Sequence, residues 1–145
     1  MLPKLIKGNN FKDYRGSLKY NNDFNLSQIK RMYSIENLDI QLKRGWQGHK
    51  IEQRWFTAVS GKFEINLLKI DDWKHPSKNL KPLLFELSSE TFNILHIPSG
   101  YVTCIQSKEL ISKLLIMSDH NHGEIDDEYK FSLEQFECSK NVTAK

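Results

Sequence analysis

Thirteen residues from Arg44 to Phe56, RGWQGHKIEQRWF, concentrate side chains that can bind and transform a small polar molecule. They include two arginines, one histidine, one glutamate, two glutamines and two tryptophans. Arginine presents a planar fork of N–H donors that fits phosphate oxygens, and a tryptophan face can stack on a base or a sugar ring. Histidine can exchange a proton near neutral pH. The segment predicts a site for a phosphorylated carbohydrate; the alternative is that its tryptophans are core residues and its charged side chains are solvated.

The side chains that follow this segment alternate as in a half-buried strand. In the predicted strand Gln53–Val59, Arg54 shares one face with Phe56 and Ala58, because successive residues of a strand point to opposite sides. An arginine on an apolar face predicts a polar group directed into a cavity. The alternative is that Arg54, near a strand end, reaches solvent with its head group.

Short β-type runs separated by polar turns dominate the chain and predict an all-β sandwich or barrel. Ser60-Gly61 separates two such runs, so we expect a hairpin there, and Pro98-Ser99-Gly100 predicts another turn. Helix is scarce, with single turns expected at Glu109–Lys113 and Ser132–Phe136. The expected strands are Leu2–Ile6, Gly16–Tyr20, Ile29–Ile35, Gln53–Val59, Lys62–Lys69, Pro82–Leu87, Asn93–Ile97, Val102–Gln106 and Ser112–Met117.

Length and composition narrow the class of protein. A chain of 145 residues with 39% hydrophobic residues can enclose one core, so we expect one domain over residues 1–138 and a polar tail over 139–145. The net charge of +3 arises from 21 basic and 18 acidic residues mixed along the chain, which does not indicate a nucleic-acid polymer as partner. No run approaches the ~20 apolar residues of a membrane span. We expect a soluble, cytoplasmic protein.

The two cysteines lie far apart in the sequence. Cys104 falls in an apolar run and Cys138 in the polar tail region, with no CxxC or Cys/His spacing suited to zinc. We interpret both as free thiols, weakly placed for a disulfide. His120 and His122 form an HxH sequence near acidic residues, which we interpret as an exposed loop rather than a metal site.

The order of the motifs KDYRGSL, IKRMYSI, RGWQGHK, SGKFEI, IPSGYV and KLLIMSD resembles that of the cupins that epimerise or isomerise dTDP-4-keto-6-deoxy sugars. These are the dTDP-4-dehydrorhamnose 3,5-epimerase and 3,4-ketoisomerase families, including WxcM-like proteins. The resemblance spans about residues 9 to 136. It implies an antiparallel, RmlC-like cupin jelly roll with a dTDP-sugar as ligand, in deoxysugar or polysaccharide biosynthesis.

The resemblance also implies roles for individual residues. Arg44, in the RG that opens the central motif, would contact the sugar nucleotide, and Arg54 would join it. Gln47 stands where the epimerases have their general-base histidine, and an amide cannot take a proton at neutral pH. His49 matches the second histidine of the ketoisomerases and is the remaining candidate base. Tyr33 lies where those enzymes place a pocket tyrosine, as a possible acid or hydrogen-bond donor.

Further residues are assigned more loosely. Tyr101 could donate a hydrogen bond and Lys113 could offset the charge of an enolate; each is equally a candidate for a wall or surface residue. Thr103 stands where metal-binding cupins have a histidine, so no metal and no cofactor are expected. Dimers of this family commonly exchange their N-terminal strand, so we expect a homodimer in which Arg15 approaches the diphosphate in the partner's pocket.

Three functions follow from these observations. The first is an isomerase, either an epimerase or a 3,4-ketoisomerase of a dTDP-4-keto-6-deoxy sugar, with His49 as base. The second is a non-catalytic cupin that binds a nucleotide sugar or another carbohydrate, because Gln47 replaces the expected base. The third is an interaction module with a vestigial pocket.

Overall fold

The computed structural model describes residues 1–143, and nearly all of its regular structure is antiparallel β-sheet. A single turn of 3-10 helix, η1 (Leu26–Gln28), begins where the side chain of Asn25 accepts a hydrogen bond from the N–H of Ser27. The strands are β1 (Lys4–Ile6), β2 (Asn9–Asp13), β3 (Gly16–Tyr20), β4 (Arg31–Glu36), β5 (Lys43–His49), β6 (Arg54–Ser60), β7 (Lys62–Lys69), β8 (Leu83–Ser88), β9 (Ile94–Ile97), β10 (Tyr101–Ser107), β11 (Lys113–Ser118) and β12 (Glu128–Lys130).

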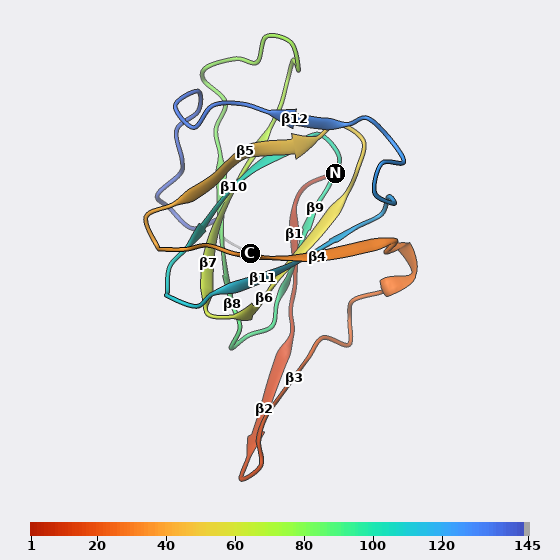
Figure 1. The fold of residues 1–145 in the computed structure, drawn as a ribbon, viewed down its shortest axis with the longest axis vertical. Coiled ribbons are helices and arrows are strands. Elements are labelled where there is room, and N and C mark those ends of the chain that lie inside the picture. The colour runs from red at the N-terminus through yellow and green to blue at the C-terminus, as the bar shows by residue number, and fades with distance from the viewer. Residues whose placement is uncertain (144–145) are drawn as a thin grey trace.

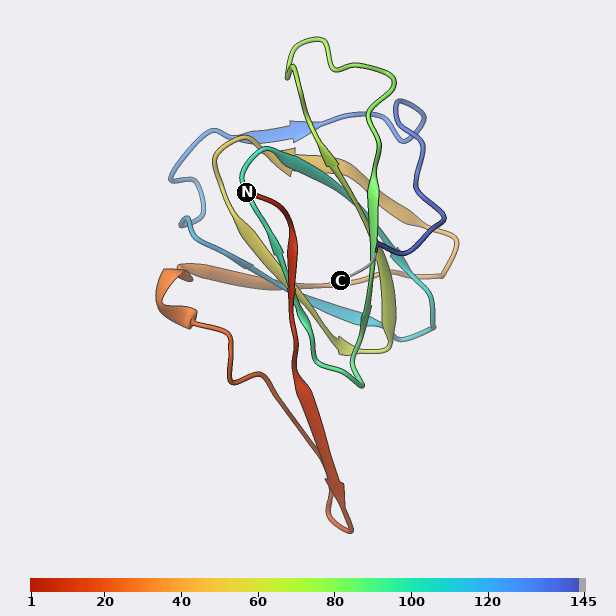
Figure 2. The same ribbon diagram turned by 180° about the vertical axis from the view of Figure 1, so that it is seen from behind.

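Two five-stranded sheets form the body of the molecule (Figures 1 and 2). One has the order β1-β9-β6-β11-β4 and the other the order β12-β5-β10-β7-β8. Most neighbouring strands are distant in the sequence, as in a jelly roll. The prediction of an all-β cupin-type jelly roll is therefore confirmed in its architecture. Among the described residues, no helix is long and apolar enough to span a membrane.

The main core lies between the two sheets. Alternating residues of facing strands supply it, among them Phe56 and Ala58 of β6 and Phe63, Ile65 and Leu67 of β7, all fully buried. Burial of one such large apolar side chain contributes roughly 1.5–3 kcal/mol. The packing of these inward faces fixes the register of the strands, because a slip by one residue would turn the core side chains to the solvent.

The connection at Ser60-Gly61 is not the hairpin that we predicted. β6 pairs with β9 and β11, whereas β7 pairs with β8 and β10, so the chain passes from one sheet to the other. Gly61 has a positive φ of 72°, and a Cβ there would lie 2.0 Å from the Oγ of Ser112. The local turn signal was correct, but the packing of both apolar faces against each other separated the strands.

Nine predicted strands are present, with their ends moved by at most two residues, and β7 matches its predicted range. β2, β5 and β12 were not predicted. β5 carries two glycines and polar side chains, which are weak strand formers, and it becomes a strand because β10 and β12 flank it. The expected helical turns at 109–113 and 132–136 are non-helical turns.

The outer face of the second sheet carries a separate apolar cluster that contains Trp46, Val102 and Cys104. The C-terminal segment covers it, and the Phe136 ring packs edge-on against Trp46 with centroids 5.8 Å apart. The expected polar tail continues along the body as far as the described chain reaches, since the N–H of Thr143 donates to the carbonyl of Leu84 at 2.7 Å.

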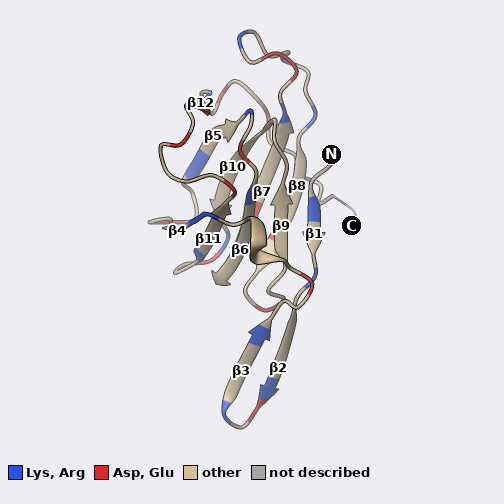
Figure 3. Ribbon diagram, turned by 90° about the vertical axis from the view of Figure 1, so that its right-hand side faces the viewer, with Lys and Arg blue, Asp and Glu red and all other residues tan. Residues whose placement is uncertain are grey.

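The hairpin of β2 and β3 projects away from the two sheets (Figures 1 and 3). Phe11 and Leu18 are partners in its register, and they remain 52% and 62% exposed. Arg15 lies in the turn and is held by Asp13, whose carboxylate accepts from its Nη2 at 2.7 Å. The hairpin therefore presents an apolar surface with a cation at its tip.

Candidate functional site

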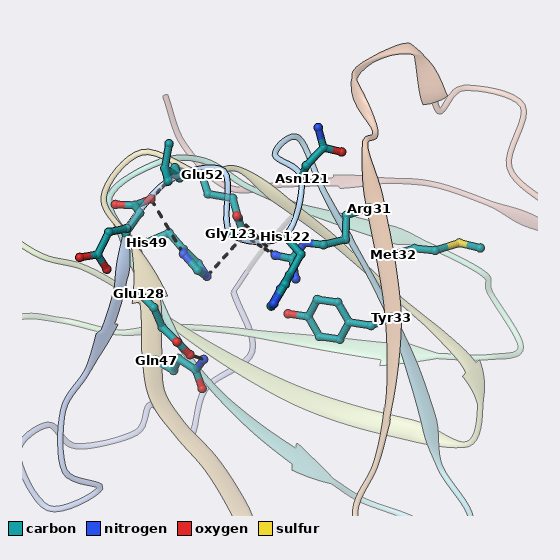
Figure 4. A pocket seen from close by; sticks show the side chains of 13 residues that line it. Arg31, Met32, Tyr33, Gln47, His49, Glu52, Asn121, His122, Gly123 and Glu128 are labelled. Carbon is teal, nitrogen blue, oxygen red and sulfur yellow. Dashed lines mark hydrogen bonds and ion pairs between the residues drawn. The ribbon is translucent and has the colours of Figure 1, made fainter.

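An open cavity of about 530 Å³ lies where β4 and β5 face each other, beneath the loop that joins β11 to β12. Figure 4 shows the side chains of this cavity wall. β4 supplies Arg31 and Tyr33, β5 supplies Gln47 and His49, and the following loop supplies Glu52. The β11–β12 loop closes the opposite side with residues 121–123 and 125–127.

His49 is a half-buried histidine of the cavity wall, enclosed by two carboxylates. Its side chain is 12% exposed, with Nε2 3.4 Å from a carboxylate oxygen of Glu52 and Nδ1 3.9 Å from one of Asp127. Burial and the nearby Arg54 guanidinium lower the pKa of His49 to about 4, and Asp127 opposes them. His49 is consequently a neutral imidazole at neutral pH, which is the form that can accept a proton.

Asp127 fixes the turn that follows β5. One carboxylate oxygen accepts a hydrogen bond from the N–H of Lys50 at 3.0 Å, and the other accepts from Ile51 at 2.9 Å and from Glu52 at 2.8 Å. Side chains that accept several backbone N–H groups hold a turn in one conformation. Asp127 thereby links the β11–β12 loop to the segment that carries His49 and Glu52.

Two arginines lie on either side of the same β11 residue. Arg31 of β4 and Arg54 of β6 are both register partners of Ser118. Arg31 pairs with Glu52 at 3.3 Å. Arg54 is 4% exposed, its guanidinium lies 5.1 Å from the centre of the Phe56 ring, and its Nη2 has no hydrogen-bond partner among the described residues.

The burial of Arg54 confirms that this side chain points inward with Phe56 rather than into solvent. Burial lowers its pKa, and the neighbouring Tyr33 and Glu52 act in the opposite direction. A guanidinium remains charged even so. Beneath the cavity there is therefore a fixed positive charge, and the carboxylates of Glu52, Asp126, Asp127 and Glu128 line the wall above it.

Tyr33 and Gln47 also line the cavity. The Arg31 guanidinium lies 5.2 Å from the centre of the Tyr33 ring, and Figure 4 shows the ring of Tyr33 on the side opposite His49. The amide nitrogen of Gln47 donates to the carboxylate of Glu128 on the neighbouring β12. Of the residues that we predicted, His49, Tyr33 and Gln47 thus come together, with Arg54 buried behind them.

The other four predicted site residues do not line this cavity. Arg44 lies near the opposite end of β5, where its Nε donates to the Asn37 side chain at 2.7 Å. Tyr101 pairs with His49 in register, but its side chain is part of the main core. Lys113 is exposed at the start of β11, away from the end that reaches the cavity, and Arg15 is at the tip of the projecting hairpin.

Ten residues of the wall were not predicted from the sequence, and five of them carry side chains of particular interest. No role was predicted for Glu52, although it belongs to the segment from Arg44 to Phe56. None was predicted for Arg31, two residues before Tyr33. His122 was interpreted as part of an exposed loop; it is exposed, yet it lines the cavity (Figure 4). Asp127 and Glu128 belong to an acidic run to which the sequence analysis assigned no role, and pairing of β12 with β5 brings them to the site. Strand pairing at this distance leaves no local sequence signal.

The HxH sequence does not assemble a metal site. His120 Nδ1 lies 2.8 Å from the Asp119 carboxylate and its Nε2 lies 3.7 Å from Glu124, whereas His122 faces the cavity. No group of three or more His, Cys, Asp or Glu side chains in residues 1–143 is arranged to hold a metal ion. Thr103 is buried, and its hydroxyl donates to the Gln47 carbonyl at 3.3 Å.

The jelly-roll sheets and the cavity between them define a cupin of the RmlC-like type. The family model described as WxcM-like, C-terminal (FdtA) matches residues 1–141. The chain belongs to this family, as its motifs predicted. No curated protein sequence matches it.

Solved structures with this fold include enzymes of two kinds. The 3,4-ketoisomerase QdtA from Thermoanaerobacterium thermosaccharolyticum, as a double mutant with TDP, is 26% identical, with a TM-score of 0.68 and 88% of each chain covered. Another QdtA mutant, with TDP-4-keto-6-deoxyglucose, is 24% identical, with a TM-score of 0.67 over 88% of each chain. The dTDP-4-dehydrorhamnose 3,5-epimerase from Bacillus anthracis, with TDP and PPi, is 14% identical, with a TM-score of 0.65 over 92% of this chain and 75% of the other.

Proposed function

We propose that this protein is an isomerase of a dTDP-linked 4-keto-6-deoxy sugar, either a 3,4-ketoisomerase or an epimerase, with His49 as its base. One observation carries the proposal: a half-buried imidazole, neutral at physiological pH, faces a cavity whose wall includes Arg31, with Arg54 buried behind it. QdtA, which has the same fold, was crystallised with TDP-4-keto-6-deoxyglucose, a ligand that contains the ketone on which this chemistry depends.

The chemistry begins at a carbon next to the ketone. The ketone acidifies the hydrogens on its neighbouring carbons, and a base that removes one of them produces an enolate. Nε2 of His49 is the accepting atom, because it faces the cavity beside Glu52. Return of the proton to the former carbonyl carbon would move the ketone, once the hydroxyl on the first carbon has given its proton to the enolate oxygen. Return to the other face of the same carbon would invert that carbon.

The enolate oxygen needs a donor in a setting with little water. The hydroxyl of Tyr33 is suited to this role, because it enters the cavity opposite His49 (Figure 4). Arg31 and Arg54 add positive charge on the same side, which would stabilise both the enolate and a diphosphate. Gln47, held by Glu128, is suited to orient a sugar hydroxyl.

The projecting hairpin supports a homodimer in this proposal. Its apolar partners Phe11 and Leu18 are left uncovered by their own chain, and a second copy would bury them. Such an arm would bring Arg15 toward the partner's cavity, where the guanidinium could meet the diphosphate. Sedimentation analysis of the Phe11→Ser and Leu18→Ser double variant tests this, and an unchanged dimer would contradict it.

Solvent-proton exchange tests the activity directly. We expect incubation with dTDP-4-keto-6-deoxyglucose in deuterated water to place deuterium at C3 or C5 of the sugar, and His49→Gln to prevent it. His75→Gln, in an exposed loop, is the matched control. Absence of exchange while calorimetry shows that the nucleotide sugar is bound would contradict the proposal.

Gln47 supports a second candidate, a cupin that binds the nucleotide sugar without turning it over. In that case Gln47→His would create activity in an inert parent. Activity in the parent that is lost in His49→Ala would exclude this candidate. If neither dTDP nor dTDP-sugars raised the melting temperature, the pocket would not serve this ligand, since a ligand at 100 times its dissociation constant adds about 2.7 kcal/mol.

A further inference from the structure

Two thiols that are 34 positions apart in the sequence meet on the face of the sheet opposite the cavity. Cys104 is buried on β10 in the apolar cluster with Trp46. Two anchors bracket Cys138 on the C-terminal segment. Phe136 packs against Trp46, and the N–H of Ser139 donates to the Asn66 side chain at 2.8 Å.

The second anchor places Cys138 above its partner. Asn66 lies directly opposite Cys104 in the pairing of β7 with β10, so the residue next to Ser139 comes to rest over this position. Cys138 packs against the same apolar cluster as Cys104, and each thiol shifts the pKa of the other. Both cysteines are free thiols, as expected, and the fold brings the segments that carry them together.

The two thiols differ in access and in charge. Cys104 is 2% exposed, whereas Cys138 lines an open groove of about 660 Å³ whose charged side chains are Lys78, Lys81, Glu134 and Glu137. The ammonium nitrogen of Lys43 lies 4.0 Å from the sulfur of Cys138. Cations beside a half-buried thiol favour its thiolate and attract anionic reagents.

The electrostatics of the pair support the same division. The hydrogen bond from Cys104 lowers the pKa of Cys138 to about 6, burial raises it, and Lys43 lowers it further. Cys104 shifts in the opposite direction, because it donates to Cys138 and is buried. At neutral pH the accessible sulfur is therefore the nucleophile, and the buried one keeps its proton.

We propose that Cys138 and Cys104 form a thiol–disulfide exchange site for anionic low-molecular-weight disulfides such as glutathione disulfide, in which Cys138 attacks and Cys104 resolves. This site lies on the outer face of the second sheet and is separate from the sugar cavity. It does not rest on the proposed isomerase activity.

The reaction proceeds in two exchanges. The Cys138 thiolate attacks one sulfur of glutathione disulfide, the S–S bond of that molecule breaks, and one glutathione leaves as a thiolate that takes up a proton. Cys104 then loses its proton to solvent and attacks the Cys138 sulfur, which releases the second glutathione. Two protein thiols are oxidised by two electrons, and one small disulfide is reduced to two thiols.

The product would tie the C-terminal segment to β10. The same segment begins at β12, which pairs with Gln47, Gly48 and His49. A covalent link between residues 104 and 138 removes freedom from the unfolded chain, so the oxidised protein should melt several degrees higher than the reduced one.

Intact mass spectrometry of the full-length protein in glutathione disulfide tests the proposal. The wild type should lose two hydrogens, and peptide mapping should recover a 104–138 disulfide after a transient glutathione adduct. Cys104→Ser should accumulate one glutathione on Cys138, and Cys138→Ser should remain reduced. A wild type that stays reduced, or that gives only a lasting adduct or a disulfide between chains, would overturn it.

A cation variant tests the geometry without altering either thiol. Lys43→Met should slow adduct formation on Cys138 by about tenfold, whereas Lys74→Met, an exposed lysine of another loop, should leave the rate unchanged. Equal rates in the two variants would contradict the assigned role of Lys43. If Cys104→Ser does not fold, Cys104→Ala can replace it as the variant that should accumulate glutathione on Cys138. The wild-type peptide map still shows whether the 104–138 disulfide forms.

Discussion

The two faces of the sheet formed by β12, β5, β10, β7 and β8 have opposite chemistry, although the same strands build them. On the outer face, Trp46 and Phe136 pack in an apolar cluster that the protein's own C-terminal segment covers. On the inner face, near the end of β5, His49 is buried among charged groups. The charged inner face is not covered by another segment of the described chain and is suited to a ligand. The aromatic outer face, which the C-terminal segment covers, stabilises the fold.

The alternation of β5 creates this difference. Gln47 and His49 point inward, whereas Trp46, which precedes Gln47, points outward, because neighbouring residues of a strand face opposite sides. In the register shift between Thr103 and Ile105, Gly45 and Trp46 of β5 oppose the single residue Cys104 of β10, which is the count of a β-bulge. Substitutions on the two faces should consequently affect different measurements.

The largest effect is expected on the inner face. His49→Gln should lower turnover of the 4-keto sugar by about 10²- to 10⁴-fold, because it removes the proton-accepting group. The affinity for dTDP, measured by calorimetry, should change little. A variant that keeps wild-type turnover would show that another group is the base.

The strongest expected effect on the outer face is a loss of stability. Trp46→Ala should lower the free energy of unfolding by roughly 3–5 kcal/mol, because it leaves a cavity beneath Phe136. Urea denaturation followed by circular dichroism measures this loss. The comparison between the faces would break down if Trp46→Ala left stability unchanged.

The free energy of unfolding should depend on pH through His49. Its folded pKa of about 4 lies below the ordinary histidine pKa of 6.5, so between these values the unfolded chain binds a proton that the folded chain does not. Stability is then fully present above pH 6.5 and decreases as the pH falls toward 4, by at most about 3 kcal/mol. Urea titrations at a series of pH values should show that His49→Gln loses this part of the pH dependence of the free energy of unfolding. The same pH dependence in the wild type and in His49→Gln would contradict a neutral imidazole at position 49.

A smaller effect is expected on ligand binding. Arg31→Met should weaken dTDP binding by about 1.5–3 kcal/mol, the contribution of a hydrogen bond to a charged group. Lys108→Met, whose lysine pairs with Glu64 rather than lining the cavity, is the control. Equal dissociation constants for both variants would remove Arg31 from the anion site.

The smallest effect is expected at Lys113, an exposed residue. Lys113→Met should change both stability and turnover by less than about 0.5 kcal/mol, as is usual for surface positions. A large loss of turnover would restore the enolate role that the sequence suggested.

The sequence predicted the strands that form the core and three residues of the cavity wall, Tyr33, Gln47 and His49. The alternation around Phe56 predicted the inward direction of Arg54, and the motifs led to the correct family. The hairpin at Ser60-Gly61 was wrong because a turn signal does not reveal which sheet the next strand joins. The roles of Asp127 and Glu128 could not be predicted, because an acidic run has the same local pattern whether it is solvated or held beside β5.

The crossing from β6 to β7 also has a kinetic consequence. Since adjacent strands of the chain enter different sheets, most strand pairs must form between segments that are far apart in the sequence. Closing such loops costs conformational entropy, and this cost arises before the stabilising contacts between the strands have formed. We therefore expect this protein to fold in milliseconds to seconds, as is typical of all-β domains with non-local pairing, and the consecutive pairs β2–β3 and β7–β8 to form before the rest.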